Sequence, residues 1–226
     1  MKIKVCAFDA YGTLFDINSA ARECSKSIKL KNFNDNWIHI SRHWREKQIS
    51  YTWLLRIMNL YKDFWEITQD SLDYALELYK LDHDKELKEK LLSLYLELDA
   101  YPEVASMLKS IKALGVKTAV LSNGSSKMLN SAINSSLIAP DLDEVLSVES
   151  IKVFKPDPRV YELVLSCFGC TRDEVLFVSS NGWDICGASN FGFKTVWINR
   201  DSLPYDKLPF SPDFTGFDLT EVSAIL

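Results

Sequence analysis

The chain has 226 residues, is 47% hydrophobic and carries a formal net charge of -5, which fits one domain, or one domain with an insertion, around a sizeable core. Phosphates and anionic lipids would be repelled over most of such a surface, so the charge argues against a general nucleic-acid or membrane-surface binder. No apolar run reaches membrane-spanning length and the five cysteines are scattered, so we expect a cytoplasmic protein with no nucleic-acid or membrane partner.

The chain opens with an apolar run, residues 3–9, that predicts a buried strand ending at Asp9. The next long segment, residues 17–98, contains no proline, no glycine and no convincing strand. Leu, Tyr and Ala recur there at three- and four-residue spacings, which predicts a small helical bundle inserted after the first strand. We expect its aromatic-rich part, residues 37–65, to form the core of that bundle.

From about residue 100, helix-like and strand-like segments alternate, and each strand is a short apolar run: VKTAVLS, EVLSV, EVLFVSS and KTVWIN. Pro102 can open a helix that Gly115 ends, and DPRVYELVLSCFG is a second helix of this kind. The order predicts an α/β fold, a Rossmann-like parallel β-sheet core flanked by helices and formed by residues 1–15 and 99–226. An inserted all-helical cap subdomain, residues 16–98, would cover the carboxyl end of the first strand, where such sheets bind ligands.

Polar residues follow four of the predicted strands: Asp9, SNGS at residues 122–125, FKPD around Lys155, and SSNGWD at residues 179–184. Each alone has an ordinary explanation as a turn former, a helix cap or a solvated charge. Because the carboxyl ends of adjacent parallel strands meet at one edge of the sheet, the four together predict a ligand site.

The stretches FDAYGTLFD, SNGS, KPDPRVYE and FVSSNGWD, in this order and spacing, resemble the haloacid dehalogenase superfamily, specifically its L-2-haloacid dehalogenases. WREKQISYTWLLRIM also resembles the helical cap of that branch, so the resemblance covers essentially the whole chain. It implies a hydrolase that converts short (S)-2-haloacids to (R)-2-hydroxyacids and halide, with inversion, through an aspartyl ester. The partners it implies are a 2-haloalkanoic acid substrate and a second copy of the chain in a homodimer.

The resemblance also implies roles for residues around the reacting carbon. Asp9 would be the nucleophile. Arg45 and Asn123 would receive the developing halide, because a guanidinium and an amide N–H stabilise charge that appears in the transition state. Ser122 and the backbone N–H of Tyr11 would hold the substrate carboxylate.

Further roles carry over to the surroundings of Asp9. Lys155 would lie close to both Asp9 and the substrate carboxylate, and Asp184 is the best candidate to activate the hydrolytic water. The residues that would orient Asp9 and the water are Thr13, Ser179, Asn181 and Tyr161. The residues that would surround the alkyl group of the substrate are Tyr11, Ile49, Phe64 and Trp183.

The sequence departs from the phosphatases of the superfamily at two places. They carry a second Asp two residues after the nucleophile to protonate the leaving alkoxide, and here that position is Tyr11. A halide leaves as a very weak base and needs no proton. Ser180 and Asn181 stand where an acid would be wanted for Mg²⁺, so we expect no metal and no cofactor.

Two alternatives stay open at this point: a Mg²⁺-dependent phosphatase or phosphotransferase of the same superfamily, and a catalytically silent binding protein with the same fold.

One further departure concerns the pocket. Relatives of the branch have Gln after the cap arginine, whereas this chain has Glu46, which leaves the polarity of the pocket open.

Overall fold

The computed structural model describes residues 2–226, and a parallel six-stranded sheet lies at the centre of that part, in the order β3-β2-β1-β4-β5-β6. The strands are β1 (Val5–Phe8), β2 (Lys117–Ser122), β3 (Glu144–Ser147), β4 (Val175–Ser179), β5 (Lys194–Ile198) and β6 (Phe214–Gly216). All neighbouring strands pair in parallel. The predicted α/β class is confirmed.

The five strands predicted from apolar runs are all present, within two residues of the expected ends. The sixth, β6, was not predicted. It has three residues, is mostly exposed and ends in Gly216, so it lacks the buried apolar run that marks the other strands. It pairs only with β5, at the edge of the sheet.

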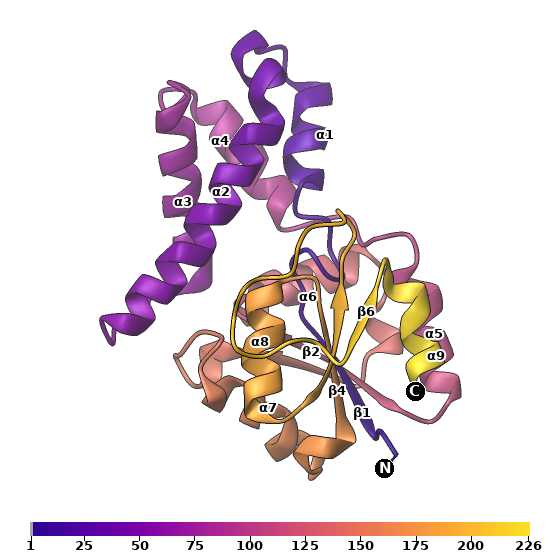
Figure 1. The fold of residues 1–226 in the computed structure, drawn as a ribbon. Coiled ribbons are helices and arrows are strands. Elements are labelled where there is room, and N and C mark those ends of the chain that lie inside the picture. Colours follow the sequence, from indigo (N-terminus) through magenta and orange to yellow (C-terminus); the bar gives the residue numbers. More distant parts are fainter. Residues whose placement is uncertain (1) are drawn as a thin grey trace.

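Helices cover both faces of the sheet. The helices of this part are α5 (Val104–Ala113), α6 (Ser126–Ser135), α7 (Pro158–Phe168), α8 (Gly182–Phe191) and α9 (Val222–Ile225), with single 3₁₀ turns between some of them. In Figure 1, α7 and α8 lie together on one side of the sheet, and α5 and α9 on the other. Helix α7 shows why the predicted bounds were right, since Pro158 stands in its first turn and Gly169, in the left-handed conformation, ends it.

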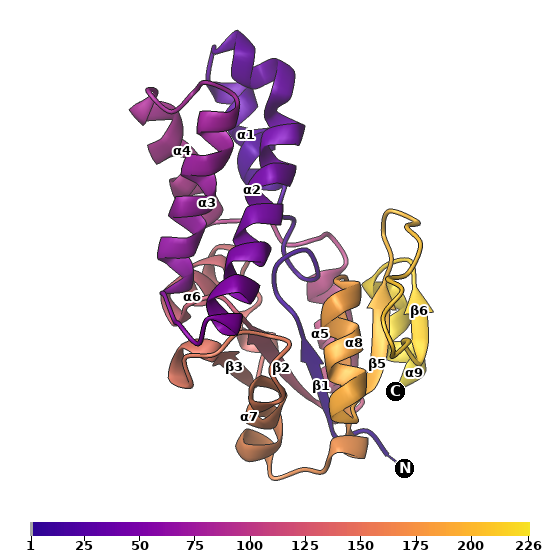
Figure 2. The same cartoon turned by 60° about the vertical axis from the view of Figure 1, so that its left-hand side comes forward.

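Between β1 and α5 the chain forms four helices, as the absence of proline and glycine predicted. They are α1 (Ser19–Ser27), α2 (Lys31–Ile57), α3 (Phe64–Leu78) and α4 (Lys85–Tyr95). Figures 1 and 2 show them as a separate bundle beyond the carboxyl end of β1, with both chain termini at the sheet part. No helix of residues 2–226 is long and apolar enough to cross a membrane.

Part of the aromatic stretch of residues 37–65 contacts the sheet part instead of the bundle core. Trp44 is buried in the bundle, as expected. Trp53, however, packs edge-on against Trp183 of α8, and the Tyr61 ring stacks on Phe154 at 5.3 Å. The expectation that the whole stretch is bundle core was therefore wrong, because periodicity reports an apolar face but not the partner that covers it.

Gly187 in α8 allows a test of how closely this helix packs against α7 and the residues just before it. A Cβ atom there would lie 2.5 Å from the Tyr161 hydroxyl oxygen and 2.6 Å from the Pro156 Cβ. We expect Gly187→Ala to lower the free energy of unfolding, measured in urea, by about 1–3 kcal/mol. Asn190→Ala, at an exposed position of the same helix, should change it by less than about 0.5 kcal/mol. Equal stability of Gly187→Ala and the wild type would contradict the close packing.

Candidate active site

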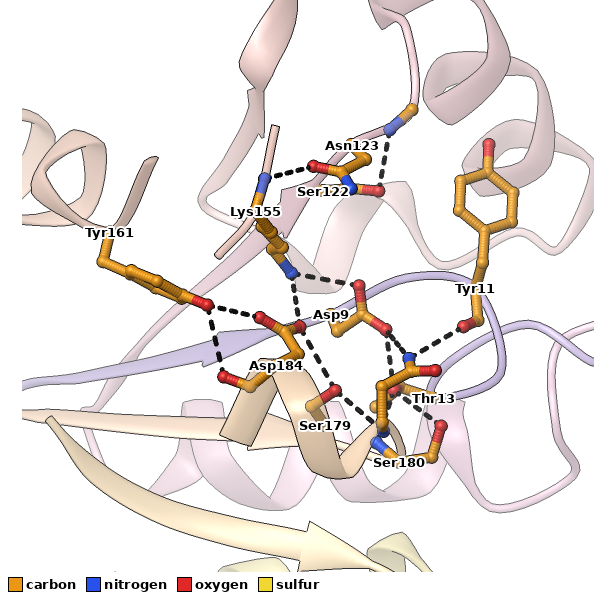
Figure 3. Close-up of polar contacts among 12 residues, drawn as sticks. Asp9, Tyr11, Thr13, Ser122, Asn123, Lys155, Tyr161, Ser179, Ser180 and Asp184 are labelled. Atoms are coloured by element: carbon orange, nitrogen blue, oxygen red, sulfur yellow. Dashed lines mark hydrogen bonds and ion pairs between the residues drawn. The ribbon is translucent and has the colours of Figure 1, made fainter. Parts of the chain in front are cut away.

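Asp9 lies directly after β1, with its backbone N–H bonded to the Val178 carbonyl of β4 and only 5% of the residue exposed. Its side chain accepts three hydrogen bonds (Figure 3). Lys155 Nζ donates to Oδ1 over 3.0 Å, while Thr13 Oγ1 and Asn181 Nδ2 donate to Oδ2 over 3.1 and 2.8 Å. The carboxylate is therefore aimed and largely shielded from bulk water.

The loop after β4 supplies part of this support. The backbone N–H of Asn181 donates to Ser179 Oγ, and that of Ser180 donates to Thr13 Oγ1 over 2.9 Å. Because Thr13 Oγ1 accepts from Ser180, its own proton is available for Asp9. Ser180 thus takes part in the site, although the sequence pointed to it only as the residue standing in place of an acid.

Lys155 lies between two carboxylates. Its Nζ is 3.0 Å from Asp9 Oδ1 and 2.7 Å from Asp184 Oδ2, and the residue is 1% exposed. Burial alone would lower the pKa of the Lys155 ammonium, but the two carboxylates outweigh burial and raise that pKa above its ordinary value. The ammonium therefore remains charged at neutral pH.

Asp184 is fully buried at the start of α8 and accepts from three side chains. Besides Lys155, the Tyr161 hydroxyl donates to Oδ1 over 2.8 Å and Ser179 Oγ donates to Oδ2 over 3.2 Å. Burial raises the pKa of Asp184 to about 6, with Asp9 adding to the rise and Lys155 opposing it. A carboxylate of this pKa is a stronger base than an exposed one and is still ionised at neutral pH.

Ser122 and Asn123 follow β2 and come to the same edge of the sheet. Ser122 Oγ accepts from the Gly124 N–H over 3.1 Å, and Asn123 Oδ1 accepts from the backbone N–H of Lys155 over 2.9 Å. The second bond orients the amide of Asn123, because its oxygen is engaged and its NH₂ group remains as the free donor.

Arg45 reaches the site from helix α2. Its guanidinium donates to Gln48 Oε1 over 2.7 Å and to the Tyr11 carbonyl over 3.1 Å. The second bond joins the bundle to the loop that carries Asp9. A further contact between bundle and sheet part is the Arg56 side chain on Asp157, at 2.7 Å.

A small closed cavity lies between α2 and the sheet edge. Its walls are Asp9, Tyr11, Arg45, Ile49, Thr52, Phe64, Ser122, Asn123 and Trp183. Besides Asp9 and Thr52, the walls consist of seven residues, and the resemblance implied a substrate contact for each of the seven. The accessible volume is about 10 Å³, close to the minimum for one water molecule, so this conformation is closed. A wider cleft of about 410 Å³ shares Tyr11 and Arg45 with it.

The structure also shows which residues do not line the cavity. Glu46 points away, with its side chain 60% exposed and 3.8 Å from Arg42, so the polarity that it adds lies outside the cavity walls. Sequence reasoning missed Thr52 and Gln48. Gln48 lies three residues after Arg45, and Thr52 lies three residues after Ile49 and seven after Arg45. These helical spacings from two predicted site residues are the signal that could have found them.

The donor set at Asp9 does not fit Mg²⁺. Residues 2–226 contain no group of three or more His, Cys, Asp or Glu side chains placed to hold a metal ion. The two buried carboxylates of the site, Asp9 and Asp184, share the Lys155 ammonium, so each already has a cation as its partner.

Residues 3–192 match the family model of the haloacid dehalogenase-like hydrolases. The chain belongs to this family. The (S)-2-haloacid dehalogenase 4A of Burkholderia cepacia is 42% identical over 202 residues, which cover 89% of this chain and 85% of that protein. The haloacetate dehalogenase H-2 of a Moraxella species is 39% identical over 214 residues, 95% of this chain and 93% of that protein.

A solved structure of similar fold is the L-2-haloacid dehalogenase of Xanthobacter autotrophicus with chloropropionic acid covalently bound. It superposes with a TM-score of 0.88 at 33% identity and covers 99% of this chain and 98% of that one. The structural similarity thus extends over both the sheet part and the bundle of this chain.

Lys155→Met tests the charge balance of the site. Without the ammonium, Asp9 and Asp184 face each other unpaired, so the free energy of unfolding at pH 8 should fall by about 3–5 kcal/mol. A carboxyl whose pKa is raised in the folded state destabilises that state as pH rises through the raised pKa. We therefore expect the loss, measured in urea, to shrink between pH 8 and pH 5.

Lys127→Met, on the exposed start of α6, is the matched control and should show little change at either pH. A loss in Lys155→Met that is the same at pH 8 and pH 5 would show that the ammonium does not balance these carboxylates.

Proposed function

We propose that this chain hydrolyses short (S)-2-haloalkanoic acids to (R)-2-hydroxyacids and halide through an ester on Asp9. The observation that supports this most strongly is the closed cavity. The Asp9 carboxylate lies at one wall, held by three donors, and the Arg45 guanidinium belongs to another. A shielded, oriented carboxylate is a far better nucleophile than a hydrated one.

The first step we propose is displacement of the halide. One Asp9 oxygen attacks the halogen-bearing carbon from behind, a carbon–oxygen bond forms, and the halide leaves with the electron pair of the carbon–halogen bond. The free NH₂ group of Asn123 and the guanidinium of Arg45 stabilise the charge that appears on the halide. The configuration of the carbon is inverted.

The second step we propose is hydrolysis of the ester at the Asp9 carbonyl. Asp184 takes a proton from water, and the water oxygen attacks that carbonyl and remains in the regenerated carboxylate. One water proton ends on the product hydroxyl, and the other leaves to solvent by way of Asp184. Because the substrate carbon is not attacked again, the inverted configuration persists in the product.

The walls of the cavity support a short substrate with one carboxylate. Ser122 and the Tyr11 backbone N–H would hold that carboxylate, and Ile49, Phe64 and Trp183 would surround the alkyl group. The closed cavity is too small for such an acid, so entry requires opening. We propose that residues 16–98 act as the cap that opens and that residues 1–15 and 99–226 form the core.

The partner that we expect, besides the substrate, is a second copy of the chain. Four apolar side chains at the end of α2 are exposed and give such a copy a surface to cover: Leu54, Ile57, Met58 and Leu60. A cytoplasmic location stays a prediction.

Halide release tests the activity directly. With excess EDTA and racemic 2-chloropropionate, we expect chloride release to stop near half conversion and the product to be R-lactate alone. In ¹⁸O water, a single turnover should place the label in Asp9 and leave lactate unlabelled. Asp9→Asn should reduce the rate below about one-thousandth, because an amide cannot form the ester.

Asp35→Asn, on the exposed start of α2, is the matched control and should keep wild-type activity. Label in lactate, retention of configuration, or hydrolysis of phosphate esters that requires Mg²⁺ without any halide release would each overturn the proposal.

The pKa of Asp184 predicts how the second step depends on pH. Water activation needs the ionised carboxylate, and in the free enzyme its pKa is about 6. Esterification neutralises Asp9, one of the charges that raise this pKa, so in the ester it should lie lower. We expect ester hydrolysis, followed by rapid quench and mass spectrometry, to be constant above pH 6 and to slow at more acid pH, where the ester accumulates.

The sign of this pH effect is diagnostic. Ester that accumulates at pH 8 and disappears at pH 5 would mean that a protonated group, and not ionised Asp184, drives the second step.

A further inference from the structure

Gln48 is a buried polar side chain of α2 to which the proposed reaction assigns no part. It lies one turn after Arg45, is fully buried, and its Oε1 accepts the 2.7 Å hydrogen bond from the Arg45 guanidinium. The second hydrogen bond of the guanidinium goes to the backbone carbonyl of Tyr11 over 3.1 Å.

The amide of Gln48 can present only its oxygen to Arg45. Its Nε2 donates to Thr68 Oγ1 over 2.7 Å, and Thr68 Oγ1 donates its own proton to the Phe64 carbonyl over 2.7 Å. A hydroxyl has a single proton, so Thr68 must act as the acceptor toward Gln48. Thr68 is fully buried as well, so water does not compete for these groups.

A third helix completes the arrangement. The Tyr95 hydroxyl, from the end of α4, donates to Gln48 Oε1 over 3.1 Å. Its ring stacks on the Tyr11 ring, with centroids 5.8 Å apart, and Tyr11 is a wall of the cavity. Side chains of α2, α3 and α4 therefore together fix the position of Gln48 Oε1, which accepts the hydrogen bond from Arg45.

The charge of this acceptor matters as much as its position. Gln48 is neutral, and so is the Tyr11 carbonyl, so the hydrogen bonds that position Arg45 leave its positive charge uncompensated. A carboxylate at position 48 would form a buried ion pair with Arg45 and cancel most of the charge available to a leaving halide.

We propose that Gln48 is a positioning residue that directs the Arg45 guanidinium to the leaving halide without neutralising it. The inference rests on the proposed function and extends it, because it makes ester formation, and not ester hydrolysis, dependent on a residue outside the cavity. Ester formation with loss of chloride should depend on Gln48 more than ester formation with loss of iodide, since iodide is the larger ion and the better leaving group.

The experiment compares Gln48→Glu and Gln48→Met with the wild type. In an Asp184→Asn background, where we expect the ester to persist, mass spectrometry follows ester formation alone. With 2-chloropropionate we expect Gln48→Glu to slow ester formation by about ten- to a hundredfold, with KM little changed. The loss should be smaller with 2-iodopropionate. Gln48→Met, which keeps the charge of Arg45 but loses its acceptor, should fall between Gln48→Glu and the wild type.

Gln69→Glu is the matched control, because it makes the same substitution on α3 next to Thr68, where Gln69 is partly exposed and has only a 3.4 Å bond to the Trp65 carbonyl. It should leave ester formation unchanged. Urea unfolding of each variant separates a loss of fold from a loss of positioning.

The possible outcomes separate this inference from the proposed function. No halide release by the wild type would overturn the proposed function itself. An active wild type with an equally active Gln48→Glu, or an equal loss for chloride and iodide together with a raised KM, would overturn the role of Gln48 alone and leave the ester mechanism in place.

Discussion

The site depends on one buried ammonium between two carboxylates. Lys155 lies 3.0 Å from Asp9 and 2.7 Å from Asp184, and without it two like charges would share a nearly dry space. The sheet makes this triad possible, because β1 and β4 are neighbours and the loop after β3 returns Lys155 to the same edge. The fold thus holds the proposed nucleophile and the proposed base side by side, on either side of one ammonium.

The bundle completes a site that the sheet alone leaves open. The sheet edge aims Asp9, but the cation that lines the same cavity, Arg45, comes from α2. Electrostatic help of this kind is strongest where water is excluded, and the closed cavity excludes nearly all of it. The proposed nucleophile and the proposed halide acceptor therefore belong to different parts of the chain, which are joined by contacts such as Arg56 with Asp157.

Much of this arrangement could be predicted from the sequence, for identifiable reasons. Buried parallel strands are continuous apolar runs, so polar residues at their ends are easily recognised in the sequence. The resemblance to a known family then predicted most of the residues that line the cavity. Contacts between elements were not visible in this way. From the sequence, Trp53 and Tyr61 appear as bundle core, because the residues that they contact are not known. The hydrogen bonds that fix Gln48 involve Thr68 and Tyr95, which lie on two other helices. Periodicity contains no information about such pairings.

Helix α2 is a single uninterrupted rod of 27 residues, about 40 Å long. Arg45, Ile49 and Thr52 at the cavity and Arg56 at the sheet part are all fixed to it, so they can only move together. Whatever admits an acid also withdraws the group that would accept its halide. In the proposed reaction, an oversized acid that holds the rod away would bind beside Asp9 without reacting, so discrimination by size would appear as a difference in turnover more than as a difference in affinity.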